Sequence, residues 1–297
     1  DFRTPEGKAD LLGLISEADV VIENFKVGGL AKYGLDYASL KGTNPRLVYC
    51  SITGFGQTGP YAPRAGYDFL MQGMSGLMSV TGEIDGEPQK YGVAVTDVFT
   101  GLYSVIAIQA ALAFRERTGL GQHIDMSLLD VATAVTANQG FNTLATGKAP
   151  GLTGNAHVNI VPYQVFPTSD GHVIVTCGNN GQYSRFCDVL GRPDLATHED
   201  YNTNPKRVTN RSTLVPILRE ETMKHTKIEI LAACEENVVP AGPINNMNEL
   251  FADPHIQARG MQIELEGLPA IRSPMRFSES SLAIKTAAPK LGAHTDK

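Results

Sequence analysis

Two short apolar runs alternate with helical segments near the start of the chain, and this alternation constrains the fold most strongly. Residues 19–23 (DVVIE) and 46–52 (RLVYCSI) are apolar through their centres, which is typical of parallel strands buried on both faces. Helical patterns at residues 8–17, 30–34 and 37–41 accompany them. The alternation predicts an α/β fold with a doubly wound, Rossmann-like large domain.

After Ala149, the alternation of strand and helix patterns stops. Residues 150–159 resemble a linker, and residues 163–166 and 172–177 predict a hairpin around the turn at residues 168–171. Helical patterns follow it, which predicts a smaller α+β domain. We therefore expect a large domain at residues 1–149 plus 267–297, a linker at 150–159 and a small domain at 160–266.

Charge and cysteine usage exclude several classes of protein. The 297 residues carry a net charge of −6, whereas a nucleic-acid-binding protein is expected to show a basic stripe, so we expect no nucleic-acid partner. The four cysteines are far apart and the histidines are scattered. This spacing argues against a disulfide framework and against any metal site, and it favours reduced thiols in the cytoplasm, or in the mitochondrial matrix of a eukaryote.

Residues 98–114 form the most apolar stretch, but Thr100, Ser104 and Gln109 interrupt it. We interpret it as a core helix buried on most sides and expect no membrane association. The chain begins with DFRTPEGKADLL, which lacks the pattern of a signal peptide.

Asp97 directly precedes this long apolar helix. The simplest interpretation is an N-cap, since aspartate is strongly preferred at that position. A carboxylate there would also be held ionised by the helix N-terminus and would be available as a nucleophile. Both interpretations stay open at this point.

Gly178, Asn179, Asn180, Gly181 and Gln182 form a segment between a strand and a helix. The segment fits a plain tight turn. It also fits a flexible lid whose backbone N–H groups face an oxyanion.

The segment at residues 53–67 (TGFGQTGPYAPRAGY) is rich in glycine and proline and follows a predicted strand. Parallel α/β folds bind ligands at such loops. Tyr67 and Asp68 fit a helix start, and basic residues such as Lys26, Lys32 and Arg64 fit either solvated side chains or phosphate or carboxylate ligands. No G-x-G-x-x-G follows a strand and no P-loop is present, so a standard dinucleotide or P-loop site is not supported.

The order of several short motifs is more specific than any single one. They are Glu23-Asn24-Phe25-Lys26, Asn44-Pro45-Arg46-Leu47, residues 53–60 (TGFGQTGP), 64–68 (RAGYD), Thr81-Gly82, Thr96-Asp97, 119–122 (GLGQ), 178–182 (GNNGQ) and 291–295 (LGAHT). This series resembles the class III coenzyme A transferase family, the CaiB/BaiF-like proteins, which also contains α-methylacyl-CoA racemases. Residues 50–60, 160–164 and 242–247 resemble the branch that handles short dicarboxylates, the succinyl-CoA:glutarate-type transferases.

The resemblance implies a mechanism and assigns roles to residues. Asp97 matches the catalytic aspartate, which attacks an acyl-CoA thioester and passes through an anhydride and an aspartyl-CoA thioester before a carboxylic acid accepts the CoA. Gly178, Asn179, Asn180, Gly181 and Gln182 match a mobile loop that closes over the oxyanion. Asn24, Phe25, Lys26, Lys32, Tyr67 and Asp68 match the CoA site, although relatives often carry arginine at the position of Lys32. CoA is thus a substrate, and no tightly bound cofactor is expected.

Two further expectations come from the resemblance. Family members form an interlocked homodimer, in which each chain threads through a ring made by the other. They also have an additional N-terminal segment, so this chain looks truncated, and an inactive fragment is one alternative. An acyl-CoA racemase is another, but racemases carry histidine where this chain has Tyr67, and a phenol is a poor base at neutral pH.

Arg64 is the candidate for recognising the substrate. A dicarboxylate places a second carboxylate in the acyl pocket, where a cationic partner is needed. Arg64 lies three residues before Tyr67, and its guanidinium can bind a carboxylate through two parallel hydrogen bonds. A surface arginine or a contact to a CoA phosphate is the alternative.

Overall fold

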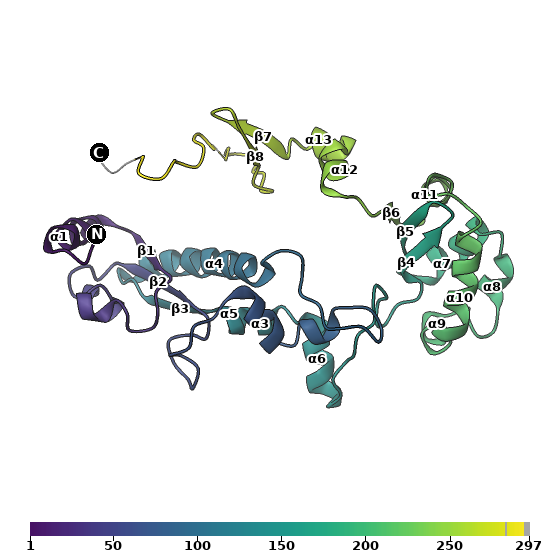
Figure 1. The fold of residues 1–297 in the computed structure, drawn as a ribbon, viewed down its shortest axis with the longest axis horizontal. Helices are drawn as coiled ribbons and strands as arrows, with labels where there is room; N and C mark the ends of the chain where they lie inside the picture. Colours follow the sequence, from purple (N-terminus) through teal and green to yellow (C-terminus); the bar gives the residue numbers. More distant parts are fainter. Residues whose placement is uncertain (283, 294–297) are drawn as a thin grey trace. The chain divides into compact units, whose positions relative to one another are not determined.

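The computed structural model describes residues 1–282 and 284–293 (Figure 1). The chain divides into two compact units, Asp1–Val158 and Asn159–Lys297, and each unit is described by itself. His294 and Thr295 of the terminal LGAHT motif lie outside the described residues. The expected assignment of residues 267–297 to the large domain stays a prediction.

The first unit alternates helices with short strands. Its elements are α1 (Pro5–Glu17), β1 (Val20–Glu23), η1 (Ala31–Tyr33), α2 (Tyr37–Leu40), β2 (Val48–Thr53), α3 (Asp68–Met74), η2 (Met78–Val80), α4 (Val95–Thr118), β3 (His123–Ser127), α5 (Leu128–Ala134) and α6 (Ala137–Thr146).

The three strands of this unit form a parallel sheet in the order β1-β2-β3. Val20 pairs with Val48, and Tyr49 pairs with His123, so β2 is the central strand. Both apolar runs of the sequence form strands of this sheet, which confirms the expected parallel α/β arrangement.

Helices cover both faces of β2. On one face, Val48 and Cys50 pack against Ile108 and Ala111 of α4. On the other face, Tyr49 packs with residues of α1, α2 and the connecting segment (Ile15, Leu35 and Leu40). A strand whose side chains are buried alternately against two helical layers must be apolar at consecutive positions, as residues 47–50 are.

The expectation that α4 is buried on most sides is wrong for this chain. One stripe of α4 is buried, including Thr100 and Ser104, whose hydroxyls each donate to the carbonyl four residues earlier at 2.7 Å. Leu102 and Ile106 on other faces of the helix are 55% and 63% exposed. Hydroxyls that bond to their own helix can be buried at no loss of hydrogen bonds, so Thr100 and Ser104 share the buried stripe of α4 with Ile108. By length and composition alone, α4 is one helix that could cross a membrane.

The sequence predicts one helix over residues 128–146, but the structure has two. The chain leaves the helical path at Val135 and Thr136, and Ala137 has a positive φ of 48°. β-branched residues crowd this stretch, and the Thr136 hydroxyl donates to the carbonyl of Thr133. Both features favour a break over a continuous helix.

The second unit begins with a hairpin and continues mainly in helices. Its elements are β4 (Tyr163–Thr168), β5 (Gly171–Thr176), α7 (Asn180–Val189), α8 (Pro193–Thr197), α9 (Asn204–Thr209), α10 (Arg211–Thr222), α11 (Lys227–Glu236), β6 (Ala241–Pro243), α12 (Met247–Ala252), α13 (Pro254–Ala258), β7 (Gln262–Leu265) and β8 (Leu268–Ile271).

The predicted hairpin is confirmed. β4 and β5 are antiparallel and are connected at Ser169 and Asp170, and β6 adds a third antiparallel strand beside β5. β7 and β8 form a separate two-stranded sheet. The unit therefore combines antiparallel sheets with helices.

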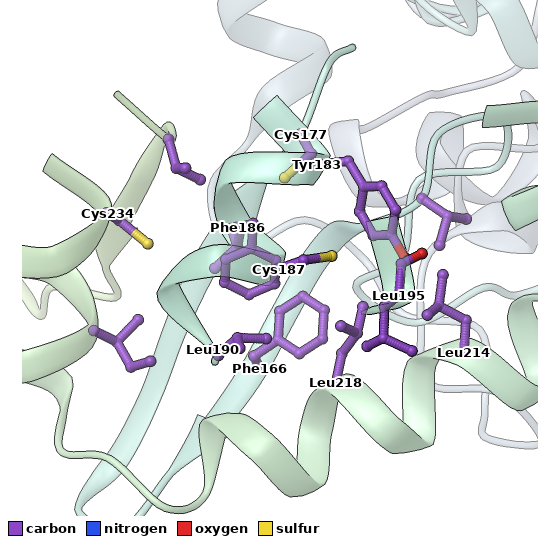
Figure 2. Packing of buried hydrophobic residues seen from close by; sticks show 14 of the residues in the cluster. Phe166, Cys177, Tyr183, Phe186, Cys187, Leu190, Leu195, Leu214, Leu218 and Cys234 are labelled. Atoms are coloured by element: carbon purple, nitrogen blue, oxygen red, sulfur yellow. The ribbon is translucent and has the colours of Figure 1, made fainter. Parts of the chain in front are cut away.

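The core of the second unit lies between this hairpin and helices α7, α10 and α11 (Figure 2). Phe166 of β4 and Phe186 of α7 pack with their ring centroids 5.9 Å apart. Three cysteines, Cys177, Cys187 and Cys234, are buried there as free thiols. Burial raises the pKa of each thiol, so these cysteines act as small apolar core residues.

Candidate functional site

The ends of β1 and β2 are joined by one of the predicted site residues. Asn24 follows β1, and its side-chain amide donates to the carbonyl of Ile52 in β2 at 2.6 Å. This bond fixes the segment after β1 against the central strand. The candidate loops after both strands therefore begin at the same edge of the sheet, where parallel α/β folds bind ligands.

The predicted CoA-binding residues beside Asn24 are accessible. The ring of Phe25 is half exposed and packs edge-on against Phe2 at 5.7 Å. Lys26 lines a pocket of about 320 Å³, together with Tyr37, Ser51 and His123. The carboxylates of Glu23 and Asp36 also line this pocket, so a phosphate group fits only on the side of Lys26.

Lys32 does not belong to the lining of this pocket. It is exposed, and its ammonium lies 4.8 Å from the ring centroid of Tyr33. Of the two predicted lysines, Lys26 is thus the one that the structure places at a hollow of the surface.

The Gly/Pro-rich loop at residues 53–67 folds back upon itself at two glycines. A Cβ on Gly54 would lie 2.7 Å from the Cα of Gly66, so only glycine permits this approach. The loop holds Arg64 against aromatic rings, with its guanidinium carbon 4.5 Å from the ring centroid of Tyr61 and 5.2 Å from that of Phe55. The exposed guanidinium is thereby stacked and keeps its N–H groups available.

Asp68 connects three segments of the first unit. One carboxylate oxygen accepts the backbone N–H of Thr96 at 2.8 Å, and the other accepts the side-chain amide of Gln72 at 2.6 Å. Gln72 is 1% exposed, and its own carbonyl oxygen accepts the N–H of Tyr91 at 2.8 Å. Tyr67 beside Asp68 is 77% exposed. Asp68 is therefore engaged inside the protein, whereas Tyr67 faces outward from this unit.

The prediction that Asp97 caps the long helix is wrong. α4 begins at Val95, three residues before the expected start at Val98, so Asp97 lies within the first turn. The N-cap residue of α4 is Ala94, which has no capping side chain. The carboxylate that accepts a donor of this first turn belongs to Asp68 instead. Asp97 is exposed and is thus free of a capping role.

The helix N-terminus is not the dominant influence on the pKa of Asp97. The helix end favours the charged form, but partial burial and the nearby carboxylate of Asp68 together raise the pKa of Asp97 above its ordinary value. A carboxylate whose charge is less stabilised by its surroundings is a better nucleophile once ionised. Because the Asp97 side chain is also exposed, its carboxylate is accessible to a reacting group.

The glycine-containing segment of the second unit lies at the start of helix α7. Asn180, Gly181 and Gln182 form the first turn of α7, and Asn179 is its N-cap, accepting the N–H of Gln182 at 2.9 Å. The side-chain oxygen of Gln182 accepts the N–H of Gly178 at 2.8 Å. The segment is a capped helix start rather than a simple turn.

This arrangement leaves two backbone donors at the start of α7. Within residues 1–282 and 284–293, no acceptor of the chain is bonded to the N–H of Asn180 or of Gly181. Adjacent N–H groups at a helix N-terminus are oriented to bind a negative oxygen.

Two residues of these sites were not predicted from the sequence. Gln72 bridges Asp68 and Tyr91, and Arg207 in α9 donates to the side chain of Asn180 at 3.0 Å. Gln72 follows Asp68 by one helical turn, and this spacing is a signal that could have suggested the contact. Arg207 is distant in sequence and carries no such signal.

The part of the chain that the structure describes contains no group of three or more histidine, cysteine, aspartate or glutamate side chains able to hold a metal. The candidate groups are thus one exposed carboxylate, the backbone donors at a helix start and cationic side chains. Their chemistry is acyl transfer and anion binding.

A family model described as CoA-transferase family III matches residues 1–295. The chain is 56% identical over 299 residues to succinate–glutarate CoA-transferase of Agrobacterium fabrum, covering 99% of this chain and 75% of that protein. It is 39% identical to succinyl-CoA:glutarate CoA-transferase of Homo sapiens, covering 99% of this chain and 68% of that protein. A crystal structure of a CaiB/BaiF family protein from Brucella suis is 56% identical, with a TM-score of 0.88, and is matched over 99% of this chain and 78% of that one.

Proposed function

Because the chain belongs to CoA-transferase family III, we propose that it moves CoA from succinyl-CoA to a dicarboxylic acid through covalent intermediates on Asp97. Enzymes of this family use acyl-CoA substrates. The observation that carries the proposal is the placement of Asp97, an exposed carboxylate in the first turn of α4 whose capping role is filled by Asp68.

In the first half-reaction, the Asp97 carboxylate attacks the thioester carbonyl. The C–S bond breaks, CoA leaves as the thiolate, and a mixed anhydride remains. The thiolate then attacks the aspartyl carbonyl of the anhydride and releases the donor carboxylate, which leaves an aspartyl-CoA thioester. The acceptor acid reverses both steps: its carboxylate displaces the thiolate, and the thiolate attacks the new acyl group and regenerates Asp97. Two similar half-reactions replace one difficult exchange.

Each attack develops negative charge on a carbonyl oxygen. We propose residues 178–182 for this oxyanion because they resemble the loop of the family that closes over it. Donors fixed before the reaction stabilise such charge without reorganisation.

The CoA nucleotide is assigned to the pocket beside Asn24, Phe25 and Lys26. The ammonium of Lys26 offers a charge to a phosphate, and the polar wall of the pocket offers the hydroxyl of Ser51 and the ring of His123, which lie 2.9 Å apart. The second carboxylate of the substrate is assigned to Arg64, whose stacking on Tyr61 and Phe55 leaves its donors available.

Replacement of the nucleophile tests the function. Asp97→Ala should abolish the exchange of CoA between succinyl-CoA and glutarate and leave the fold intact, since Asp97 is exposed and caps nothing. Incubation of the unchanged protein with succinyl-CoA and hydroxylamine should modify Asp97, which mass spectrometry would locate. Normal turnover by Asp97→Ala would refute the assignment.

Two other functions are separated by simple measurements. A racemase would wash deuterium into the α-carbon of an acyl-CoA in the absence of any acceptor acid, and a transferase would not. A chain that is an inactive fragment would bind CoA poorly in isothermal titration compared with a version extended at its N-terminus.

We also propose that the protein acts as an interlocked homodimer in the cytoplasm. The exposed apolar residues of α4 support the dimer, because side chains such as Leu102 and Ile106 gain from burial against a second copy. The four cysteines, all free and buried, fit a reducing compartment.

A further inference from the structure

Gln57 carries a buried hydrogen-bond donor that has no partner among the described residues. The side-chain nitrogen Nε2 of Gln57 is buried and bonds to no acceptor there. Gln57 also lines the pocket of about 320 Å³ that Lys26 lines. Leaving a buried donor unpaired costs free energy, and nearly all such donors in folded proteins are paired. A molecule bound in the pocket can supply the acceptor that the chain does not.

Two hydrogen bonds hold the loop that carries Gln57. The backbone N–H of Gln57 donates to both carboxylate oxygens of Asp125 in β3, each at 3.0 Å. Gly56 has a positive φ of 81°, and its N–H donates to the hydroxyl of Thr53 in β2 at 3.0 Å. Glycine adopts this backbone conformation without strain. The loop is therefore bonded to both strands, and Gln57 reaches the pocket wall from a fixed backbone.

The pocket also has two half-buried carboxylates, those of Glu23 and Asp36. Glu23 accepts the N–H of Phe25 at 2.7 Å, and Asp36 accepts the hydroxyl of Ser39. Neither carboxylate forms an ion pair within residues 1–282 and 284–293. Burial raises the pKa of Tyr49, and the charges of Glu23 and Asp36 raise it further. This side of the pocket therefore repels a phosphate and favours a ligand group that donates hydrogen bonds.

Aromatic side chains complete the pocket wall. Tyr37 and His123 both line it, and their rings stack with centroids 5.3 Å apart and planes 20° apart. Nucleic-acid bases stack on such side chains. The pocket thus combines aromatic rings, carboxylate acceptors and an unpaired amide donor. Adenine matches this combination, because it carries an amino donor beside a ring-nitrogen acceptor.

We propose that Gln57 is a further ligand-binding residue of this pocket: its side-chain amide donates to a ring nitrogen of the adenine of CoA, whose amino group donates to the carboxylates of Glu23 and Asp36. This inference rests on the proposed transferase function, which assigns the CoA nucleotide to this pocket. The acidic side of the pocket then recognises the base, and Lys26 binds a phosphate.

Gln57→Leu tests the role of the amide donor. The probe is adenosine 3′,5′-bisphosphate, the nucleotide part of CoA, titrated calorimetrically into the full chain. We expect its Kd to rise about tenfold, because the ligand loses one hydrogen bond. The melting temperature of the free protein should stay the same or increase, since the variant removes an unpaired buried donor. A purely structural role of Gln57 would lower the melting temperature instead.

Inosine 3′,5′-bisphosphate tests recognition of the base, because it carries a carbonyl oxygen in place of the amino group. The unchanged protein should bind it about tenfold more weakly or worse, since a carboxylate facing that oxygen has no donor. Lys26→Met should weaken the binding of both nucleotides equally, because it removes a phosphate contact and leaves the base contacts. Gln139→Leu makes the same substitution as Gln57→Leu at a glutamine that does not line the pocket, and it should leave both Kd values unchanged.

Three results would overturn the inference: no binding of adenosine 3′,5′-bisphosphate to the unchanged protein, equal affinities for the two nucleotides, or an unchanged Kd in Gln57→Leu. The CoA exchange assay separates it from the proposed function. If the unchanged protein transfers no CoA but shows the expected Kd differences, the proposed function fails and recognition of adenine by Gln57 stands. If the unchanged protein is active and Gln57→Leu keeps its Kd, only the inference about Gln57 fails.

Discussion

Asp68 supports the proposed nucleophile in two ways. Its carboxylate accepts the N–H of Thr96, which holds the first turn of α4, and its charge contributes to the raised pKa of Asp97. The bond to Thr96 positions the helical turn that carries Asp97. The charge of Asp68 destabilises the ionised carboxylate of Asp97, which is the form that attacks in the proposed reaction. Asp97 itself is left without a capping bond, so its carboxylate can be converted into an anhydride without loss of the helix start.

Asp68→Asn should shift the pH dependence of the reaction. The pKa of Asp97 is raised by partial burial and by the charge of Asp68, so activity is lost as the pH falls through that raised pKa and Asp97 takes up a proton. Removal of the Asp68 charge lowers the pKa of Asp97. The acid limb of kcat/KM, measured from neutral pH downward, should therefore move to lower pH. A limb that moves to higher pH would contradict this electrostatic role.

Arg64→Met should distinguish dicarboxylate from monocarboxylate acceptors. Loss of one charge-assisted bidentate contact costs about 1.5–3 kcal/mol, which corresponds to roughly 10- to 150-fold in KM for succinate or glutarate. A monocarboxylate of similar length should be affected far less. Equal effects on both acceptors would show that Arg64 serves CoA or the loop instead.

At the scale of elements, a short polar network joins α3, the segment before α4 and α4 itself. Gln72 in α3 donates to Asp68 and accepts from the N–H of Tyr91, and Asp68 accepts from the N–H of Thr96. The side chains of Gln72 and Asp68 are both paired in this network, which makes it costly to disturb. The position of Asp97 thus depends on three segments rather than on α4 alone.

Gln72→Leu should destabilise the first unit and slow the reaction. The change keeps the volume but leaves the Tyr91 N–H and one oxygen of Asp68 without partners, at a cost of about 1–3 kcal/mol. Thermal unfolding should show this loss, and kcat should fall because α4 is held less firmly.

Gln139→Leu is the matched control, because it makes the same substitution at a glutamine outside this network. Its side-chain oxygen is buried with no partner among the described residues, so replacement by leucine should be neutral or stabilising. A loss of stability in Gln139→Leu as large as in Gln72→Leu would contradict the role given to the network.

At the scale of the whole molecule, helix α4 exposes a row of large apolar side chains. Several large side chains of α4 face away from the sheet, among them Val98, Leu102, Val105 and Ile106, each more than half exposed. Contiguous apolar surface of this kind marks an interaction site. In the proposed homodimer, a second copy of the chain covers these apolar side chains.

Leu102→Lys combined with Ile106→Lys should therefore break the dimer. Two charges in a buried apolar interface are strongly unfavourable, so light scattering at micromolar concentration should show the mass of one chain. Ile228→Lys, at a residue 79% exposed on α11, should leave the mass unchanged. A monomer formed by the unchanged protein would contradict the proposed assembly directly.

The sequence by itself determined the kind of fold and the kind of chemistry. The apolar runs at residues 19–23 and 46–52 predict neighbouring parallel strands, and both form. Burial on both faces holds for β2, whereas β1 is an edge strand whose Ile22 is 59% exposed. The hairpin at residues 163–176 follows from apolar runs around a turn. The order of the short motifs identified the family, and the family model matches residues 1–295.

Only the tertiary structure decided how the individual residues are used. Asp97 was expected to cap α4, but a carboxylate 29 residues earlier, Asp68, accepts the donor of that turn. Gly178–Gln182 was expected to be a loop, but Asn179 caps α7 there and Arg207 holds Asn180. The physical reason is the same in each case. A local pattern shows which groups need partners, but many residues can supply a hydrogen bond, and the folded chain alone selects the one that is near.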